Sequence, residues 1–249
     1  MAEVFISYAR TDQGFAHDLN AALQKLQRDT WIDWRSIPDS AQWRAEIFAA
    51  IEAADNFLFI ISPDSVRSWM CGQEVAHAVA NKKRIVTILY HKVDYNELLP
   101  GLKEIQWINY PELGFEHTFQ RLITAIDTDL DWVRSHTRVL VRALEWDRNE
   151  RDNSFLLRGM DLQNAIEWLA QAPTIKEPKL LPLQEEHIRA SQKREAEELE
   201  HAQRRERVAN LARACRLRAE QLGGRPGAQH PARDARGGSV LVAQPDHAS

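Results

Sequence analysis

Short apolar segments alternate with amphipathic helical patterns over the first 130 residues, and this alternation limits the possible fold more than any other feature. Strands are expected at 4–8, 31–34, 57–61, 84–90 and 104–109, with helices at 11–26, 43–54, 65–80 and 115–126. Strands that are apolar on both faces and are joined by helices form a parallel sheet covered on both sides. The sequence therefore predicts a flavodoxin-like α/β fold with a five-stranded parallel sheet. Ligands of such sheets bind beyond the carboxyl ends of the strands, which points to the loops after Tyr8, Asp33 and Ser62.

Composition argues against several classes of protein. The 249 residues contain 32 Lys+Arg against 36 Asp+Glu, so a net charge of −4 provides no general basic field for nucleic acid. The two cysteines, Cys71 and Cys215, are too few for a disulfide framework or a cysteine zinc site, and they favour a reducing, cytoplasmic location. The histidines lack metal-ligand spacing, so no metal site is predicted. The N-terminus has no signal-peptide pattern and no stretch is apolar enough to span a membrane, so we expect neither export nor insertion.

The strand pattern ends near residue 130, and the rest of the chain is predicted to be helical or unstructured. We expect a helical extension at 133–172, a Pro-containing linker at 173–183, a charged helix at 184–222 with a solvated face, and a disordered tail at 223–249. The apolar seam of the charged helix covers about two heptads, which is too short to predict a coiled coil. Large apolar side chains such as Trp132 and Trp168 must be shielded from water, so the extension is expected to pack on or beside the α/β domain.

The common catalytic motifs are missing from the sequence. It contains no P-loop, no G-x-G-x-x-G after the first strand, no H-E-x-x-H and no G-x-S-x-G. A phospho-receiver domain would share the predicted topology, but it requires paired acids directly after the first strand. Ala9 and Arg10 occupy that place, which argues against a receiver.

Three segments are predicted to converge at the carboxyl edge of the sheet. The first, FISYAR at 5–10, ends the first strand, and the second, DWRSIP at 33–38, follows the second strand. The third, SWMCGQEVA at 68–76, lies on the helix after the third strand. Together they supply a cation, aromatic faces and one carboxylate. These groups suit a ligand that carries anionic groups and planar rings.

The three segments resemble the Toll/interleukin-1 receptor (TIR) domain family in its bacterial branch, over residues 1–132. FISYARTD is similar to the family's first conserved box, WIDWRSIPDSAQW to its second strand and BB loop, and FIISPDSVRSWMCGQEVAHAV to its third strand and following helix. The resemblance implies NAD⁺ as substrate, with no separate cofactor, and Glu74 as the catalytic carboxylate. It further implies a substrate site formed by Tyr8, Ala9, Arg10, Asp33, Trp34, Arg35, Ser36, Trp69, Met70 and Cys71. Many members have Trp four residues before the glutamate, where this chain has Met70, with Trp69 one position earlier.

The resemblance leaves three functions open. The first is an NAD⁺ nucleosidase that releases nicotinamide and either ADP-ribose or a cyclic variant, as an assembly-activated effector of bacterial immunity or stress signalling. The second is a non-catalytic module that assembles with other TIR proteins through the BB loop, and the third is a domain that binds a nucleotide without turnover. For the first two we expect self-association through Ile37, Pro38 and Trp43. Glu74 beside Tyr8 and the BB loop favours the enzyme.

Overall fold

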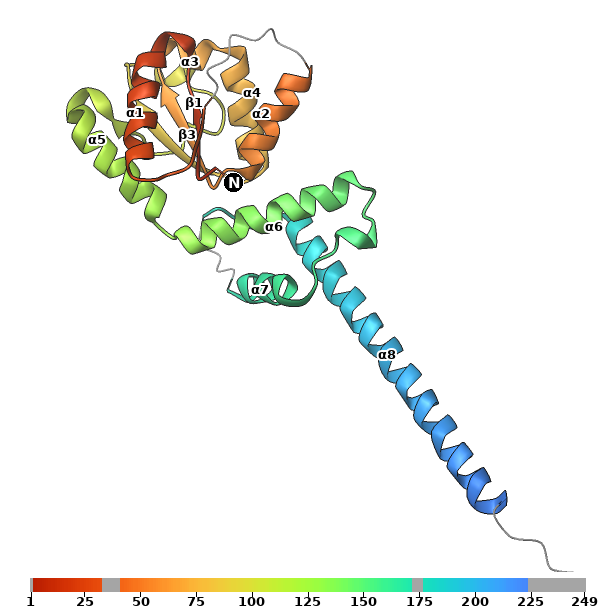
Figure 1. Ribbon diagram of the computed structural model, residues 1–249. Coiled ribbons are helices and arrows are strands. Elements are labelled where there is room, and N and C mark those ends of the chain that lie inside the picture. The colour runs from red at the N-terminus through yellow and green to blue at the C-terminus, as the bar shows by residue number, and fades with distance from the viewer. Residues whose placement is uncertain (1, 33–40, 172–176, 224–249) are drawn as a thin grey trace, which may run out of the picture. The chain divides into compact units, whose positions relative to one another are not determined.

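The computed structural model describes residues 2–32, 41–171 and 177–223 of the chain (Figure 1). It divides into two compact units, residues 1–198 and 199–249. The predicted site residues Asp33, Trp34, Arg35, Ser36, Ile37 and Pro38 lie outside the described residues. So do residues 224–249 of the predicted tail. In the described part of the chain, no helix is both long and apolar enough to cross a membrane.

A five-stranded parallel sheet forms the centre of the first unit, as the sequence predicts. The strands are β1 (Val4–Ser7), β2 (Thr30–Ile32), β3 (Asn56–Ile61), β4 (Arg84–Leu89) and β5 (Ile108–Asn109), in the order β2-β1-β3-β4-β5. β1 pairs with β2 from Val4 opposite Thr30 and with β3 from Val4 opposite Asn56. The central β3 is buried along its whole length, which explains its unbroken apolar sequence.

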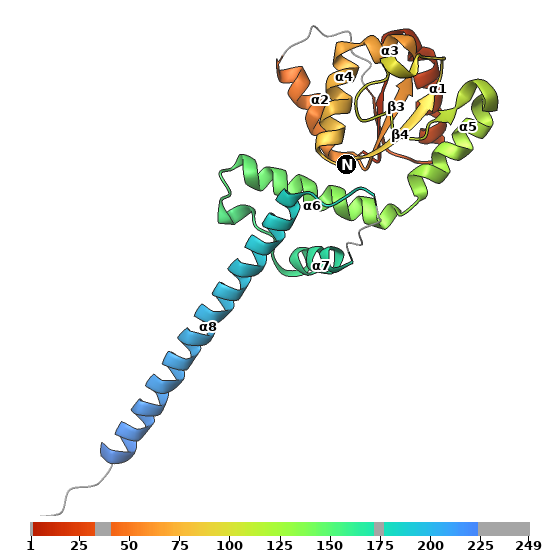
Figure 2. The same cartoon turned by 180° about the vertical axis from the view of Figure 1, so that it is seen from behind.

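Helices cover the two faces of the sheet, and side chains of β1 alternate between the two resulting cores. Figures 1 and 2 show α1 (Gln13–Lys25) and α5 (Tyr110–Asp127) on one face, with α2 (Ala41–Ala53) and α4 (Trp69–Ala80) on the other. Val4 and Ile6 belong to the core under α1 and α5. Phe5 belongs to the core under α2 and α4, so Ser7, two residues later, is directed to the same face as Phe5.

The predicted single helix at 65–80 is wrong, because the structure contains two helices there. The first, α3 (Pro63–Arg67), begins with a capping box between Ser62 and Ser65, and proline suits its first turn. Ser68 then has extended backbone angles (φ −71°, ψ 119°), and its side chain caps α4 by accepting a hydrogen bond from the Cys71 N–H. A second cap within the predicted run therefore restarts the helix.

Two further boundaries differ from the prediction. The strand expected at 104–109 is confined to Ile108–Asn109, and residues 104–107 form a turn, a bend and irregular chain. The helix expected from Phe115 begins at Tyr110, but Gly114 interrupts it with a positive φ of 68°. Glycine tolerates this conformation at little cost, so the regular helix starts close to the predicted residue.

The helices after residue 130 build a small core of their own. α6 (Leu130–Arg148), α7 (Gly159–Ala170) and the start of α8 (Pro182–Gly223) contribute to it, with α8 up to residue 198 belonging to the first unit. The apolar residues of this core are Trp132, Val139, Leu157, Leu162, Ala165, Trp168 and Ile188. A 3-10 turn at Asn153–Phe155 lies between α6 and α7.

The first turns of the charged helix, for which a solvated face is expected, also have a buried face. Gln184, His187 and Ser191 are buried there. Gln184 Nε2 donates to the His136 carbonyl over 2.8 Å, and Ser191 Oγ accepts a hydrogen bond from the Leu157 N–H over 3.0 Å. These polar side chains are buried with hydrogen bonds to main-chain groups, so an apolar pattern could not reveal their burial. In the second unit, the apolar residues Leu199, Val208, Leu211 and Leu217 are exposed.

The helical extension packs against the α/β domain through a polar junction around the buried Glu52. Trp132 and Trp168, on which the expectation of packing rested, are covered instead within the extension's own core. Arg148 of α6 donates through Nη2 to both carboxylate oxygens of Glu52 on α2, at 2.6 and 2.8 Å. The same carboxylate lies 3.0 Å from His77 Nε2 on α4. Lys83, which precedes β4, donates to the Glu52 carbonyl over 3.1 Å and to Thr137 Oγ1 of α6 over 3.0 Å. Three helices and a strand start are thereby held at one place.

Candidate active site

A cavity of about 460 Å³ opens at the carboxyl end of β1, where the fold predicts a ligand site. Its volume falls in the range of roughly 300–1,000 Å³ that is typical of small-molecule sites. The described residues that line it come from β1 and the following loop, from β2, from the first turns of α2 and α3, and from the start of α4. They are Phe5, Ile6, Ser7, Tyr8, Ala9, Arg10, Thr11, Trp31, Trp43, Asp64, Ser68, Met70, Cys71 and Glu74.

Glu74 is the buried carboxylate of this cavity. It lies in the second turn of α4 and only 8% of it is exposed. Ser7, the last residue of β1, donates a hydrogen bond from Oγ to Glu74 Oε2 over 2.5 Å. A carboxylate held at a cavity wall and largely shielded from water interacts more strongly with a nearby positive charge than an exposed carboxylate does.

Cys71 lies one turn before Glu74 and is held as a neutral thiol. Burial, reinforced by the negative charge of Glu74, raises the pKa of Cys71 to about 12. Its S–H group points to the Tyr8 carbonyl at 3.5 Å, which connects the start of α4 with the end of β1. Because the thiolate is the nucleophilic form, Cys71 is a wall residue of the cavity and not a nucleophile.

The polar rim of the cavity is formed by Arg10, Thr11 and Asp64. Arg10 and Asp64 are exposed, and Thr11 Oγ1 donates to Asp64 Oδ2 over 2.7 Å. Behind the rim, Ser62 Oγ donates to Asp12 Oδ2 over 2.5 Å, and burial of Asp12 raises its pKa in spite of this bond. These bonds tie the loop after β1 to the start of α3, so the position of the rim is fixed by both segments.

An aromatic stack borders the cavity on the β2 side. The rings of Phe5 and Trp31 are stacked at a centroid distance of 4.6 Å, and Phe5 also stacks on Phe57 at 5.5 Å. Trp43, at the start of α2, adds a half-buried aromatic side chain to the lining. The cavity therefore joins flat apolar surfaces to a cation and a carboxylate, a combination that suits a ligand with planar rings and anionic groups.

The structure brings together most of the described residues that the sequence singled out. Tyr8, Ala9, Arg10, Met70, Cys71, Glu74 and Trp43 all line the cavity. Trp69 differs, because it is 56% exposed, its ring lies 5.7 Å from the Arg44 guanidinium, and it is not among the lining residues given above. Met70 therefore supplies the cavity contact at this point of α4.

Sequence reasoning did not assign four lining residues to the site, namely Phe5, Ser7, Trp31 and Ser68, although Phe5, Ser7 and Ser68 belong to the segments predicted to converge. Ser7 directly precedes Tyr8, and the alternation of β1 could have placed it on the same face as Phe5. Ser68 falls within the single helix that the sequence predicts, so its role as a helix cap does not follow from that prediction.

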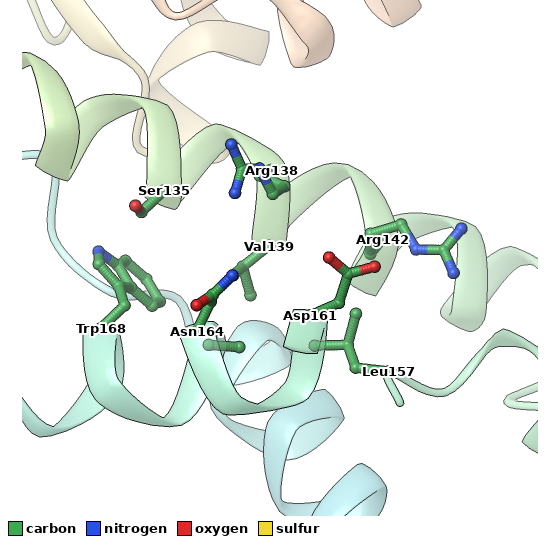
Figure 3. A pocket seen from close by; sticks show the side chains of 9 residues that line it. Ser135, Arg138, Val139, Arg142, Leu157, Asp161, Asn164 and Trp168 are labelled. Atoms are coloured by element: carbon green, nitrogen blue, oxygen red, sulfur yellow. The ribbon is translucent and has the colours of Figure 1, made fainter. Parts of the chain in front are cut away.

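A second, much smaller cavity lies between α6 and α7 in the helical extension (Figure 3). Its volume is about 80 Å³, and Arg138 and Val139 of α6 face Asp161 and Asn164 of α7 across it. This space is too small for a nucleotide and suits a few water molecules. In the described residues, no group of three or more His, Cys, Asp or Glu side chains could hold a metal ion.

Comparison with known families identifies the domain that holds the larger cavity. Residues 4–123 match the family profile described as TIR domain. This part of the chain is therefore a TIR domain, and residues 124–249 lie outside the match. The cavity and Glu74 lie within the matched residues.

The search of solved structures gave matches to proteins described as TIR proteins. One is the TIR domain of the Toll-related receptor TRR-2 from Hydra magnipapillata, at 20% identity over 51% of this chain and 98% of that chain, with a TM-score of 0.44. Another is a metazoan TIR-STING receptor from C. gigas, at 20% identity over 51% of this chain and 40% of that chain, with a TM-score of 0.40. The search of curated protein sequences gave no match.

Proposed function

We propose that the chain is an NAD⁺ nucleosidase, which cleaves the bond between nicotinamide and ribose. The observation that carries this proposal is the buried carboxylate of Glu74 at the wall of a 460 Å³ cavity. The resemblance of the surrounding segments to the TIR family supports NAD⁺ as the substrate. A role as an assembly-activated effector of immunity or stress signalling, and membership of the bacterial branch, rest on that resemblance as well.

One carboxylate is sufficient for this reaction. The nicotinamide ring is positively charged while it is bound to the ribose in NAD⁺, and it leaves as a neutral molecule. Its departure therefore requires no general acid. The ribose passes through a transition state that resembles an oxocarbenium ion, as in glycoside hydrolysis. In the proposed complex, the Glu74 carboxylate lies beside the ribose and stabilises the positive charge that develops there. Water then gives ADP-ribose, or a nucleophile within the substrate gives a cyclic product.

The remaining lining residues match the other parts of the substrate. The aromatic stack of Phe5 and Trp31, with Trp43 nearby, offers flat surfaces for planar rings. Arg10 at the rim offers a cation for the pyrophosphate. The three groups border one cavity, so a single extended dinucleotide could contact them together.

The direct test is to incubate the purified full chain with NAD⁺ and to separate nicotinamide by chromatography. A series of protein concentrations is needed, because TIR domains generally self-associate and the proposed enzyme is activated by assembly. Release of nicotinamide that increases with protein concentration supports the proposal. No release at any concentration, with NAD⁺ binding shown by calorimetry, would instead identify a nucleotide-binding domain without turnover.

A non-catalytic interaction module is the second candidate, and the tryptophans near the cavity mouth favour it. Trp43 is half-buried at the start of α2, and Trp69 is exposed on α4 near Arg44. Aromatic residues with arginine are enriched in protein interfaces. Self-association of this chain and contact with other TIR proteins would then use this region together with Ile37 and Pro38.

Trp43→Ala is compared with the wild type to find whether assembly and nicotinamide release are coupled. Release by the wild type itself separates the two candidates. If assembly completes an active site, the variant loses assembly and nicotinamide release together. This is measured by light scattering and specific activity over the same concentration series. The matched control is Trp107→Ala, at a partly buried tryptophan that is not among the residues lining the cavity, and it should leave both readouts unchanged. Loss of assembly with no nicotinamide release from the wild type would favour the interaction module.

A further inference from the structure

Ser7 makes a short hydrogen bond to Glu74, and the TIR match alone gives it no role. Its hydroxyl donates to Glu74 Oε2 over 2.5 Å, across 67 residues of sequence, and Ser7 is 2% exposed. A hydroxyl bonded to a carboxylate is a charge-assisted hydrogen bond, which is stronger than a bond between neutral groups. The contact therefore restrains the orientation of the carboxylate.

The position of Ser7 is fixed by the most rigid part of the sheet. β1 lies between β2 and β3, and Ser7 pairs with Phe59 of the fully buried β3. On the face directed at α4, Phe5 precedes it and stacks between Trp31 and Phe57. A polar group on a central strand is a precise support for a functional side chain, because neither its backbone nor its neighbours can move freely.

Glu74 itself belongs to α4, which positions its backbone but not the end of its side chain. The hydrogen bond from Ser7 on the sheet orients that end. The backbone of α4 is positioned by the Ser68 cap and by Val75 and Ala78, which are buried in the core. Those contacts set the place of the Cα atom, whereas the glutamate side chain retains several rotatable bonds. The Ser7 hydrogen bond fixes its far end by engaging Oε2, which also sets the direction of Oε1.

We propose that Ser7 is the positioning residue of the site: its hydroxyl holds the Glu74 carboxylate in the orientation that stabilises the ribose cation in the transition state. This inference rests on the proposed nucleosidase function. Ser7 is not itself a catalytic residue in this scheme, because it acts through Glu74. A carboxylate misdirected by a fraction of an ångström stabilises a developing charge less well, so the rate of the chemical step should fall more than substrate binding does.

The experiment compares Ser7→Ala with Ser7→Thr in the full chain, with nicotinamide release as the assay. Removing the hydroxyl should lower kcat on the order of ten- to hundredfold, while KM for NAD⁺ changes less than about twofold. Ser7→Thr keeps the hydroxyl and should restore kcat to within a few-fold of the wild type. Ser7→Cys, which keeps the size of serine with a weaker donor, should give an intermediate kcat and replaces the threonine variant if that one fails to fold.

The control is Ser191→Ala, which removes a buried serine hydroxyl in the helical extension. Ser191 is 1% exposed, its Oγ accepts a hydrogen bond from the Leu157 N–H over 3.0 Å, and neither residue is among those lining the cavity. This variant should lose thermal stability and keep kcat. An unchanged kcat in a folded Ser7→Ala protein overturns the inference alone, and so does a loss shared equally by Ser191→Ala. A wild-type protein that releases no nicotinamide overturns the proposed function and the inference together.

Discussion

Glu52 and Glu74 are both buried glutamates on helices that cover the same face of the sheet, but of the two only Glu74 is among the described residues that line the cavity. Glu52 on α2 receives Arg148 from α6 and His77 from α4 at hydrogen-bond distance. Although burial alone raises its pKa, these two bonds outweigh burial and hold the pKa of Glu52 below its ordinary value. Glu74 on α4 accepts a hydroxyl from Ser7 and borders a cavity.

The difference separates a carboxylate that joins parts of the protein from one directed at a ligand. At Glu52 the charge is balanced within the protein, because the carboxylate connects α2, α4 and α6. Glu74 accepts a hydrogen bond from Ser7 and also borders the cavity, where a positive charge of a ligand could approach it. Burial of an acid is therefore insufficient to mark a functional site, and the open space beside it is the additional requirement.

The largest expected effect is on catalysis and comes from Glu74→Gln. Glutamine keeps the size of the side chain and removes the charge, so the positive transition state loses its stabilisation. Nicotinamide release should fall on the order of 10²- to 10³-fold, with little change in melting temperature. The control is Glu104→Gln, at an exposed position, which should keep full activity. Wild-type turnover by a folded Glu74→Gln protein would contradict the assigned role.

The next effect is on stability and comes from Arg148→Met. Methionine keeps the apolar stem and removes the cation, leaving the Glu52 carboxylate buried with His77. The free energy of unfolding should fall by about 2 kcal/mol, as measured by urea denaturation. Arg142→Met is the matched control on the same helix, because Arg142 forms an exposed pair with Glu145 and should lose less than about 1 kcal/mol. An equal loss of unfolding free energy in the two variants would show that the burial of Glu52 does not add to the stabilising effect of its ion pair.

The junction should also make stability depend on pH through Lys83. Burial lowers the pKa of Lys83 from 10.5 to about 7, against the opposing effect of Asp55 and Glu52. Between pH 7 and 10.5 the unfolded chain binds this proton more readily than the folded chain, so stability rises as pH increases. From pH 7 to 9 this amounts to about 2 kcal/mol. The change should be absent from Lys83→Met, and a parallel pH profile in both proteins would refute it.

The smallest effect concerns thiol reactivity. Cys71 is buried with a pKa of about 12, whereas Cys215 is exposed. Iodoacetamide at neutral pH should therefore attach one group to the native chain, at Cys215, and two groups to the unfolded chain, as mass spectrometry would show. A Cys215→Ser protein should remain unlabelled while native. Labelling of Cys71 in that variant would mean that the cavity wall opens readily.

The sequence predicted the sheet well, because its strands carry a signal that does not depend on distant residues. The apolar run of β3 and the alternation of helices and strands specify a covered parallel sheet. The same reasoning placed Tyr8 and Glu74 together at the carboxyl edge of the sheet, and both line the cavity there.

What the sequence did not reveal depends on polar contacts between distant residues. The Ser7–Glu74 bond joins residues 67 positions apart, and the Arg148–Glu52 pair joins residues 96 positions apart. Neither contact produces a periodic pattern of apolar residues, so the sequence carries no local signal for it. The buried polar residues at the start of α8, such as Gln184, were missed for the same reason, because their partners are main-chain groups of other segments.

The helix break at Ser68 has a consequence for how the length of this region can vary. In a continuous helix each inserted residue would rotate everything after it by about 100°, and Glu74 would turn away from the cavity. Because the Ser68 side chain begins α4 anew, the angular phase of Glu74 is counted from that serine and not from the end of β3. Residues could be added to or removed from α3 without changing that phase, provided that the cap is retained.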